Sequence, residues 1–119
     1  MPDQPTSIPD LAALPYVDRH IGAHYAAVHR TDEVQAGIYV LDPGGRIPAH
    51  RHSASWDIAL VLEGEIEARI GDAPPVRVPA HGMNLVPPGT LHEIAHPGDR
   101  PARVLLVQSP SRGFDFLRA

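Results

Sequence analysis

The sequence predicts an all-β protein, a sandwich or a closed barrel, within a single domain of 119 residues. Short runs rich in β-branched or aromatic residues recur along the chain, and turns containing glycine, proline or aspartate separate them. No segment after Leu14 repeats its apolar residues with a helical period over the length of a helix. Many short strands joined by such turns are typical of sandwiches and barrels, and closure into a barrel removes exposed sheet edges.

The first element is expected to be an extended N-terminal arm. Three prolines, Pro2, Pro5 and Pro9, fall among residues 1–10 and disfavour regular structure there. Residues 10–14 can form one short helical turn before Pro15. We therefore divide the chain into an arm at residues 1–20 and a barrel at residues 21–119.

The first half of the barrel is expected to contain strands at residues 25–29, 34–41, 56–62 and 65–70. An Asp-Pro-Gly-Gly turn follows the second of these strands, and a Glu-Gly turn separates the last two. Residues on a strand alternate between its two faces. If Asp57 points into the barrel, Ala59 and Val61 therefore point inward with it.

The second half is expected to contain strands at residues 76–78, 83–86, 91–95 and 103–108. Turns at residues 71–75, 87–89 and 97–99, rich in glycine, proline and aspartate, separate them. If His92 points inward, Ile94 and His96 share its face. The interior would then be an apolar pocket with small side chains, which suits a small, partly hydrophobic organic molecule.

Composition excludes several classes of function. The chain has 10 basic and 14 acidic residues, and its net charge of −4 argues against nucleic acid or an anionic membrane as the main partner. It has no cysteine and its basic residues are all arginine, so thiol and Schiff-base chemistry are excluded. No run of apolar residues is long enough for a membrane span, and the start does not resemble a signal peptide. We expect a soluble, cytoplasmic protein.

The strongest chemical signal is a set of imidazole and carboxylate side chains. His50 and His52 are two residues apart, so on a strand both rings point to one face. Asp57 follows five residues after His52, and His92 follows a Pro-Pro-Gly-Thr turn. Imidazole and carboxylate are ligands that first-row divalent metals accept. The sequence therefore predicts a metal site.

Two segments resemble the two motifs of the cupin family. The first motif is matched by residues at the family's spacing, with aspartate where the family usually has glutamate: Gly44, His50, His52, Asp57 and Gly64. The second is matched by residues 87–92, which keep the proline-x-glycine-x-x-histidine spacing. It departs from the family pattern at His81, where glycine is expected, and at His96, where asparagine is usual. The resemblance spans roughly residues 25–110.

The resemblance implies a small double-stranded β-helix (jelly-roll) barrel that forms a homodimer. It also implies that His50, His52 and His92 bind one divalent transition metal ion, with Asp57 as a candidate fourth ligand. Aspartate is one methylene shorter than glutamate, so its oxygen can fall ~1 Å short of the metal, against required distances of about 2.0–2.2 Å. Asp57 can instead bind a metal-bound water or orient one of the histidines.

The other histidines carry weaker signals. His96 has three readings: a substitute ligand, a general base near the metal, or a structural residue, and the last two are favoured equally. His20, His24 and His29 are read as surface or hydrogen-bonded residues, and His81 as part of a turn at the barrel rim. Two aromatic residues, Trp56 and Tyr39, are interpreted as core or interface residues in preference to substrate contacts.

Two functions remain open from the sequence. The first is a metal-dependent enzyme acting on a small, partly apolar organic molecule, by oxygenation or by a redox-neutral isomerisation, cyclisation or lyase step. The resemblance adds tailoring of bacterial natural products as one setting for such an enzyme. The second is a non-catalytic module that binds a metal or a ligand. The donor set suits iron, manganese, cobalt, nickel and zinc alike, so the sequence does not identify the metal.

Overall fold

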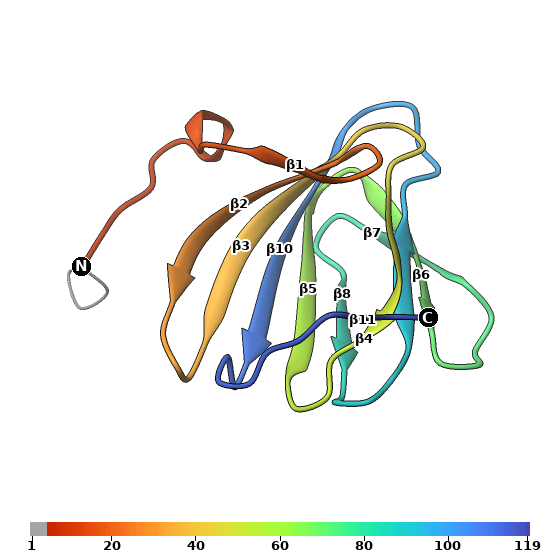
Figure 1. Cartoon of the computed structure of the whole chain (residues 1–119). Helices are drawn as coiled ribbons and strands as arrows, with labels where there is room; N and C mark the ends of the chain where they lie inside the picture. Colours follow the sequence, from red (N-terminus) through yellow and green to blue (C-terminus); the bar gives the residue numbers. More distant parts are fainter. Residues whose placement is uncertain (1–4) are drawn as a thin grey trace.

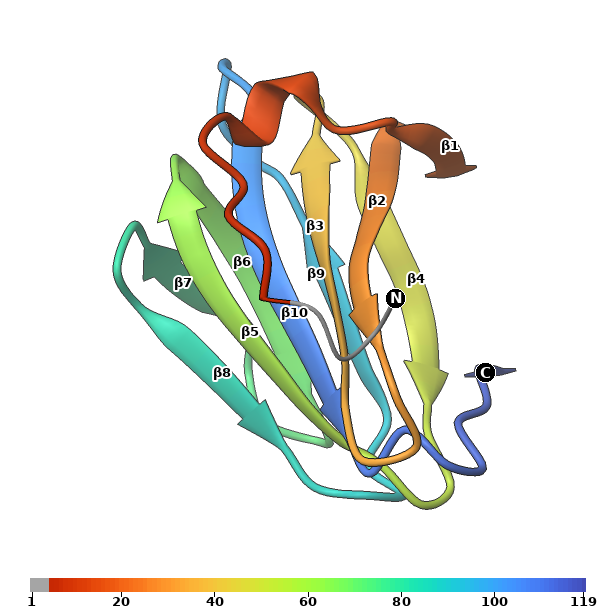
Figure 2. The same ribbon diagram turned by 90° about the vertical axis from the view of Figure 1, so that its left-hand side faces the viewer.

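The computed structural model describes residues 5–119 and arranges them in two antiparallel sheets that face each other (Figures 1 and 2). One sheet has six strands in the order β1 (Val17–His20), β2 (Ala23–Arg30), β3 (Gln35–Leu41), β10 (Ala102–Ser109), β5 (Trp56–Glu63) and β8 (Met83–Val86). The other has five in the order β11 (Leu117–Arg118), β4 (Arg46–Arg51), β9 (His92–Ala95), β6 (Glu65–Ile70) and β7 (Val76–Pro79). The predicted all-β, double-stranded β-helix barrel is confirmed.

Helical structure within the described residues is limited to a short 3-10 turn, η1 (Leu11–Ala13), at the place where one helical turn was predicted. Asp10 begins this turn because its side chain accepts a hydrogen bond from the amide of Ala12 at 3.0 Å. No helix among residues 5–119 is long and apolar enough to cross a membrane.

Three strands were not predicted from composition. β4 contains Pro48 and follows two glycines, and it becomes a strand because it pairs with β9. β11 has only two residues and pairs with β4. β1 pairs with β2, so residues 17–20, expected in the arm, belong to the six-stranded sheet. β4 and β11 therefore depend on partners distant in the chain, whereas β1 forms a hairpin with the next strand.

The inward face of the sheets changes from apolar to polar along the barrel. On β5, Asp57, Ala59 and Val61 are buried while the residues between them are half-buried, as the alternation predicted. On β10 the inward residues run from Ala102 to Gln108, and Gln108 lies opposite Asp57. The apolar core therefore fills one end of the barrel and leaves the other end for a polar site.

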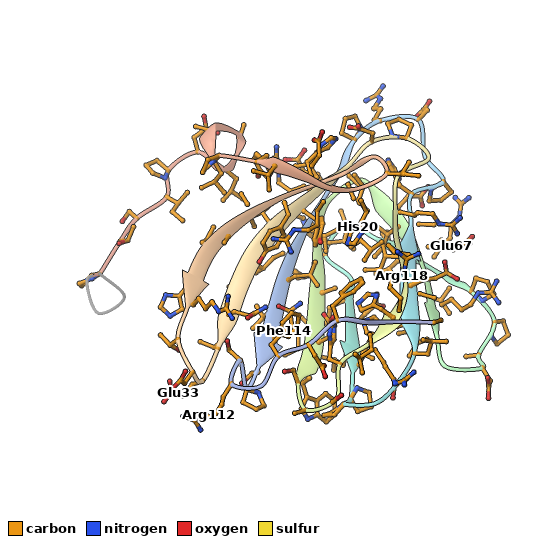
Figure 3. The ribbon with its side chains drawn as sticks, viewed as in Figure 1. His20, Glu33, Glu67, Arg112, Phe114 and Arg118 are labelled. Carbon is orange, nitrogen blue, oxygen red and sulfur yellow. The ribbon has the colours of Figure 1, made fainter. Side chains whose placement is uncertain are left out.

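The C-terminal segment, residues 110–119, crosses from one sheet to the other (Figure 1). It leaves the end of β10 and reaches β4, where Leu117 pairs with Arg51 and the amide of Ala119 donates to the carbonyl of Ala49 at 3.1 Å. Phe114 lies on this segment at the open side of the barrel (Figure 3). The segment therefore forms part of the wall around the polar end.

Candidate metal centre

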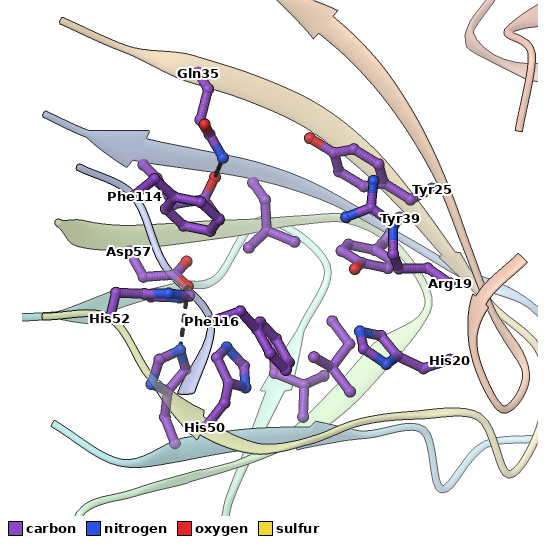
Figure 4. A pocket seen from close by; sticks show the side chains of 15 residues that line it. Arg19, His20, Tyr25, Gln35, Tyr39, His50, His52, Asp57, Phe114 and Phe116 are labelled. Atoms are coloured by element: carbon purple, nitrogen blue, oxygen red, sulfur yellow. Dashed lines mark hydrogen bonds and ion pairs between the residues drawn. The ribbon is translucent and has the colours of Figure 1, made fainter. Parts of the chain in front are cut away.

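The structure brings the four predicted metal ligands together. His50 lies on β4, His52 directly after it and Asp57 on β5 (Figure 4). His92 lies on β9. One ligand atom from each residue lies within 4.8 Å of the others. All four side chains are buried, each with an exposed fraction of 5% or less. We call these residues the histidine cluster.

Strand pairing explains this convergence. His50 lies directly opposite His92 in the β4–β9 register, so both rings reach the same inward face. The turn before β9 is fastened to the first motif, because the amide of Gly89 donates to the carbonyl of His52 at 2.7 Å. Gly89 has a φ of +82°, a left-handed conformation that glycine adopts without strain. The glycine of the second motif thus fixes the distance between the two motifs.

Each histidine of the cluster is oriented through its Nδ1 atom. Because a carbonyl oxygen only accepts hydrogen bonds, each Nδ1 carries a proton and each Nε2 presents its lone pair or a second proton to the centre. The three Nδ1 atoms donate to main-chain carbonyls: His50 to Pro48 at 2.6 Å, His52 to Asp115 at 2.6 Å, and His92 to Thr90 at 2.9 Å. Main-chain anchors of this kind are typical of histidines that bind metal.

Asp57 stands inside the cluster. Its Oδ2 atom lies 2.9 Å from Nε2 of His52 and 3.1 Å from Nε2 of His92. With both Nδ1 atoms protonated, these Nε2 atoms and the carboxylate need a cation or extra protons between them. A divalent metal ion satisfies all four donors at once, so the residues present fit such an ion. The shorter side chain of aspartate still reaches the centre.

The electrostatics of the cluster favour a neutral His50 and an ionised Asp57. Burial lowers the pKa of His50 to about 4, so this ring is neutral at pH 7. Burial alone would raise the pKa of Asp57, but its contacts with His52 and His92 outweigh that effect and hold it at about 2. Burial also acts to lower the pKa of His52, and Asp57 and the Asp115 carbonyl together raise it instead. The cluster therefore contains an ionised carboxylate.

The sequence analysis missed the contribution of the C-terminal segment. The ring of Phe116 stacks on His50, with centroids 4.1 Å apart and an interplanar angle of 16°. The ring of Phe114 lies 4.7 Å from that of His52. Asp115 supplies the carbonyl for His52, and its side chain accepts a hydrogen bond from the amide of Ser53 at 2.7 Å. The only sequence signal was the alternating Phe-Asp-Phe after Gly113, beyond the two motifs.

A cavity of about 300 Å³ opens beside the cluster. Its walls differ from the small-residue pocket that was expected, because aromatic rings line it: Tyr25, Tyr39, Phe114 and Phe116. Ala59 and Val61 are instead part of the core. The rings come from β2, β3 and the C-terminal segment, whose placement the alternation of β5 and β9 does not reveal. Tyr39 belongs to the core and also lines the cavity.

His96, the predicted general base, lies outside the cavity. Its ring is 3% exposed, its Nδ1 accepts a hydrogen bond from the amide of Gly98 at 3.3 Å, and its Nε2 donates to the carbonyl of Arg100. Both ring nitrogens are thus engaged by the turn that follows β9, and His96 is not a member of the metal-binding group. These contacts favour the structural reading, and its catalytic role stays a prediction.

The remaining side chains that were singled out take different positions. His81 lies in an exposed turn between β7 and β8, as expected, and His24 is held between Asp18 and Asp42. His20 lines the cavity and stacks on Phe116 with centroids 5.4 Å apart, which the sequence did not suggest. Trp56 is 47% exposed, so of its two interpretations the core position is wrong and the interface position stays a prediction.

Comparisons with known proteins identify the architecture. A family model described as a cupin domain matches residues 37–108, which is more than half of the chain. An uncharacterized conserved protein with a double-stranded beta-helix domain from Klebsiella pneumoniae subsp. pneumoniae MGH 78578 superimposes with a TM-score of 0.80, at 23% identity over 97% of this chain and 100% of that one.

Two further solved structures show the same fold. An RmlC-like cupin from Shewanella frigidimarina NCIMB 400 has a TM-score of 0.78 at 20% identity, over 92% of this chain and 94% of that one. A predicted oxalate decarboxylase from Thermotoga maritima has a TM-score of 0.76 at 16% identity, over 87% of this chain and 98% of that one. No curated protein matches the sequence.

Proposed function

This chain belongs to the cupin family, and we propose that it is a metal-dependent enzyme acting on a small, partly apolar organic substrate. The observation that carries this proposal is the convergence of three buried histidines and one carboxylate beside a cavity of about 300 Å³. A purely structural cluster has no need of an adjoining cavity, whereas a catalytic centre does.

The histidine cluster would hold the ion through the Nε2 atoms of His50, His52 and His92, with Asp57 as the charged member. A bound divalent ion supplies Lewis-acid polarisation of a substrate oxygen, or one-electron chemistry when the ion is redox-active. The protein itself orients the ligands and surrounds them. Main-chain carbonyls orient the rings, and the Phe114 and Phe116 side chains cover them and exclude water.

A redox-neutral reaction also needs a group that moves a proton. Among the residues that line the cavity, His20 is the one histidine outside the cluster. Burial, followed by the nearby Arg19 and Arg118, lowers the pKa of His20, so its ring is neutral at pH 7 and can accept a proton. We therefore assign the proton transfer to His20, in preference to His96.

The first test is elemental analysis of the purified protein, with His52→Ala as the cluster variant and His81→Ala as the exposed control. We expect about one equivalent of a divalent transition metal in the wild type and the control, and its loss in His52→Ala. Iron would direct the assays to oxygen consumption, and zinc, nickel or manganese to isomerase, cyclase or lyase reactions.

A second measurement separates an enzyme from a binding module. An enzyme must leave coordination positions for substrate, so azide or nitric oxide should perturb the spectrum of the iron- or cobalt-loaded protein. A protein that takes up no metal after anaerobic reconstitution with each ion would refute the proposal. A loaded site that neither small probe reaches would favour the non-catalytic module.

A further inference from the structure

Arg19 lines the cavity on the side opposite the histidine cluster. Figure 4 shows it beside Tyr25 and Tyr39, across the cavity from His52 and Asp57. Its guanidinium carbon lies 4.5 Å from the centre of the Tyr25 ring, a cation–π distance. The residue comes from β1, the strand that was expected to be part of an arm. Its position gives the cavity two charged ends.

Arg19 has no carboxylate partner within the described part of the chain. Asp18, its neighbour in sequence, contacts Nδ1 of His24 instead, at 2.6 Å. Asp42 contacts Nε2 of the same ring at 2.8 Å. Burial raises the pKa of Tyr25, and it raises that of Tyr39 to about 12, so both phenols are neutral at pH 7. An arginine that lines a cavity with no anion of the protein beside it is suited to an anion from outside.

The charge balance of the cavity points the same way. Arg19 and Asp57 are the only side chains lining it, among the residues described, whose ordinary state at pH 7 is charged, histidines apart. A divalent ion in the cluster would more than neutralise Asp57. The cavity would then be positively charged at both ends and would attract an anion.

Between the two ends aromatic rings line the cavity, together with aliphatic side chains and two glutamine amides. Phe116 lies 4.1 Å from the ring of His50 and 5.4 Å from that of His20, so rings continue from the cluster along the cavity. Tyr39 and Tyr25, 4.8 Å apart, continue them to Arg19. Surfaces of this kind stack well on planar unsaturated or aromatic groups.

We propose that the cavity binds a small organic carboxylate with a flat apolar body, whose carboxylate pairs with Arg19 while an oxygen at its other end faces the histidine cluster. This assignment rests on the proposed function, because it names the substrate class of the same site. Arg19 is a specificity-determining residue in it: a guanidinium binds a carboxylate through two parallel hydrogen bonds, which a neutral amide cannot reproduce.

The test is direct binding to the metal-loaded protein by isothermal titration calorimetry. The probes are 4-hydroxybenzoate, 4-hydroxyphenylacetate and 4-hydroxycinnamate, which differ in length, each compared with its primary amide. We expect at least one acid to bind about ten- to hundred-fold more tightly than its amide. Arg19→Gln should bring the two affinities together, and Arg19→Lys should restore part of the difference.

Arg77→Gln is the matched control, because Arg77 is exposed and pairs with Glu65 in the other sheet. Its preference for the acid should equal that of the wild type. Equal affinities of acids and amides, binding of none of the acids, or a preference that survives in Arg19→Gln would each overturn the assignment.

The same samples separate this inference from the proposed function. Metal content and turnover are measured beside the calorimetry. If the protein binds carboxylates through Arg19 but shows no turnover, the role of Arg19 is kept and the proposal of an enzyme is refuted. If the protein turns over neutral substrates and shows no preference for the acid, the role of Arg19 is refuted and the proposal of an enzyme is kept.

Discussion

At the scale of single residues, Asp57 determines the charge of the histidine cluster. Its carboxylate lies within 3.1 Å of two histidine Nε2 atoms, and its pKa of about 2 keeps it ionised throughout the physiological range. The three histidines are uncharged as ligands, so Asp57 supplies the single negative charge of the donor set. Its effect on a bound cation is therefore larger than that of any one neutral ring.

Asp57→Asn should weaken metal binding while keeping the shape of the side chain. We expect the dissociation constant to rise by about 10- to 100-fold, the range found when groups that support metal ligands are removed. Competition with a chromogenic chelator measures the change, and Asp72→Asn, in an exposed turn, is the control. An unchanged dissociation constant would mean that Asp57 neither binds the ion nor orients a ligand.

Two elements outside the barrel motifs complete the site. The C-terminal segment brings Phe116 and the Asp115 carbonyl to the cluster, and β1 brings Arg19 and His20 to the cavity. β1 is fastened by His24, whose ring nitrogens lie 2.6 Å from Asp18 on β1 and 2.8 Å from Asp42. His24 therefore adds charge-dependent contacts to the main-chain pairing that holds β1 on β2.

The attachment of β1 should weaken as pH rises. The hydrogen bonds that the His24 ring donates to Asp42 and then to Asp18 raise the pKa of His24 above its ordinary value of 6.5. The stabilisation is thus fully present below about pH 6.5 and is lost as pH rises through the raised pKa. Because the ring is partly exposed, we expect less than about 1 kcal/mol.

Urea unfolding at pH 6 and pH 9 measures this effect. The difference in free energy of unfolding between the wild type and His24→Gln should be larger at pH 6. His29→Gln, which alters an exposed histidine on the same strand, is the control. A difference that is equal at the two pH values would show that His24 does not act through its charge.

Local rules predicted most of the strands, and the resemblance to the two cupin motifs supplied all four members of the cluster. A two-residue period places His50 and His52 on one face once the segment is extended, and turn residues limit the strands. The walls of the cavity follow no local rule. Phe116 reaches it because β11 pairs with β4, which is distant in sequence, and Arg19 reaches it because residues 17–20, expected in the arm, pair with β2.

The whole molecule has an exposed apolar face on the outside of its six-stranded sheet. Met83 and Leu85 on β8 are 52% and 57% exposed, and they pair with Leu60 and Ile58 on β5. Trp56 continues this face along β5. β8 is also an edge strand, so one side of it has free main-chain groups. Surfaces of this kind often mark contacts between proteins.

We expect the protein to be a homodimer that buries this face. Leu85→Glu places a charge in it and should shift the protein towards monomer without reducing metal content, since Leu85 points away from the cavity. Sedimentation equilibrium measures the shift, and Val76→Glu, an exposed apolar position on β7 in the other sheet, is the control. A monomeric wild type at micromolar concentration would contradict the expectation.

The main-chain anchors of the histidines have a consequence for mutational tolerance. Every residue has a carbonyl oxygen, so replacing the side chain of Pro48 or Thr90 leaves the acceptor for His50 or His92 in place. The anchors of His50 and His92 lie two residues before the rings that they hold, so the local backbone conformation orients these rings and a substitution of the anchoring side chain leaves the acceptor in place. Libraries that vary the side chains at positions 48 and 90 should therefore retain the metal site, and variants with one residue inserted between anchor and ligand should lose it.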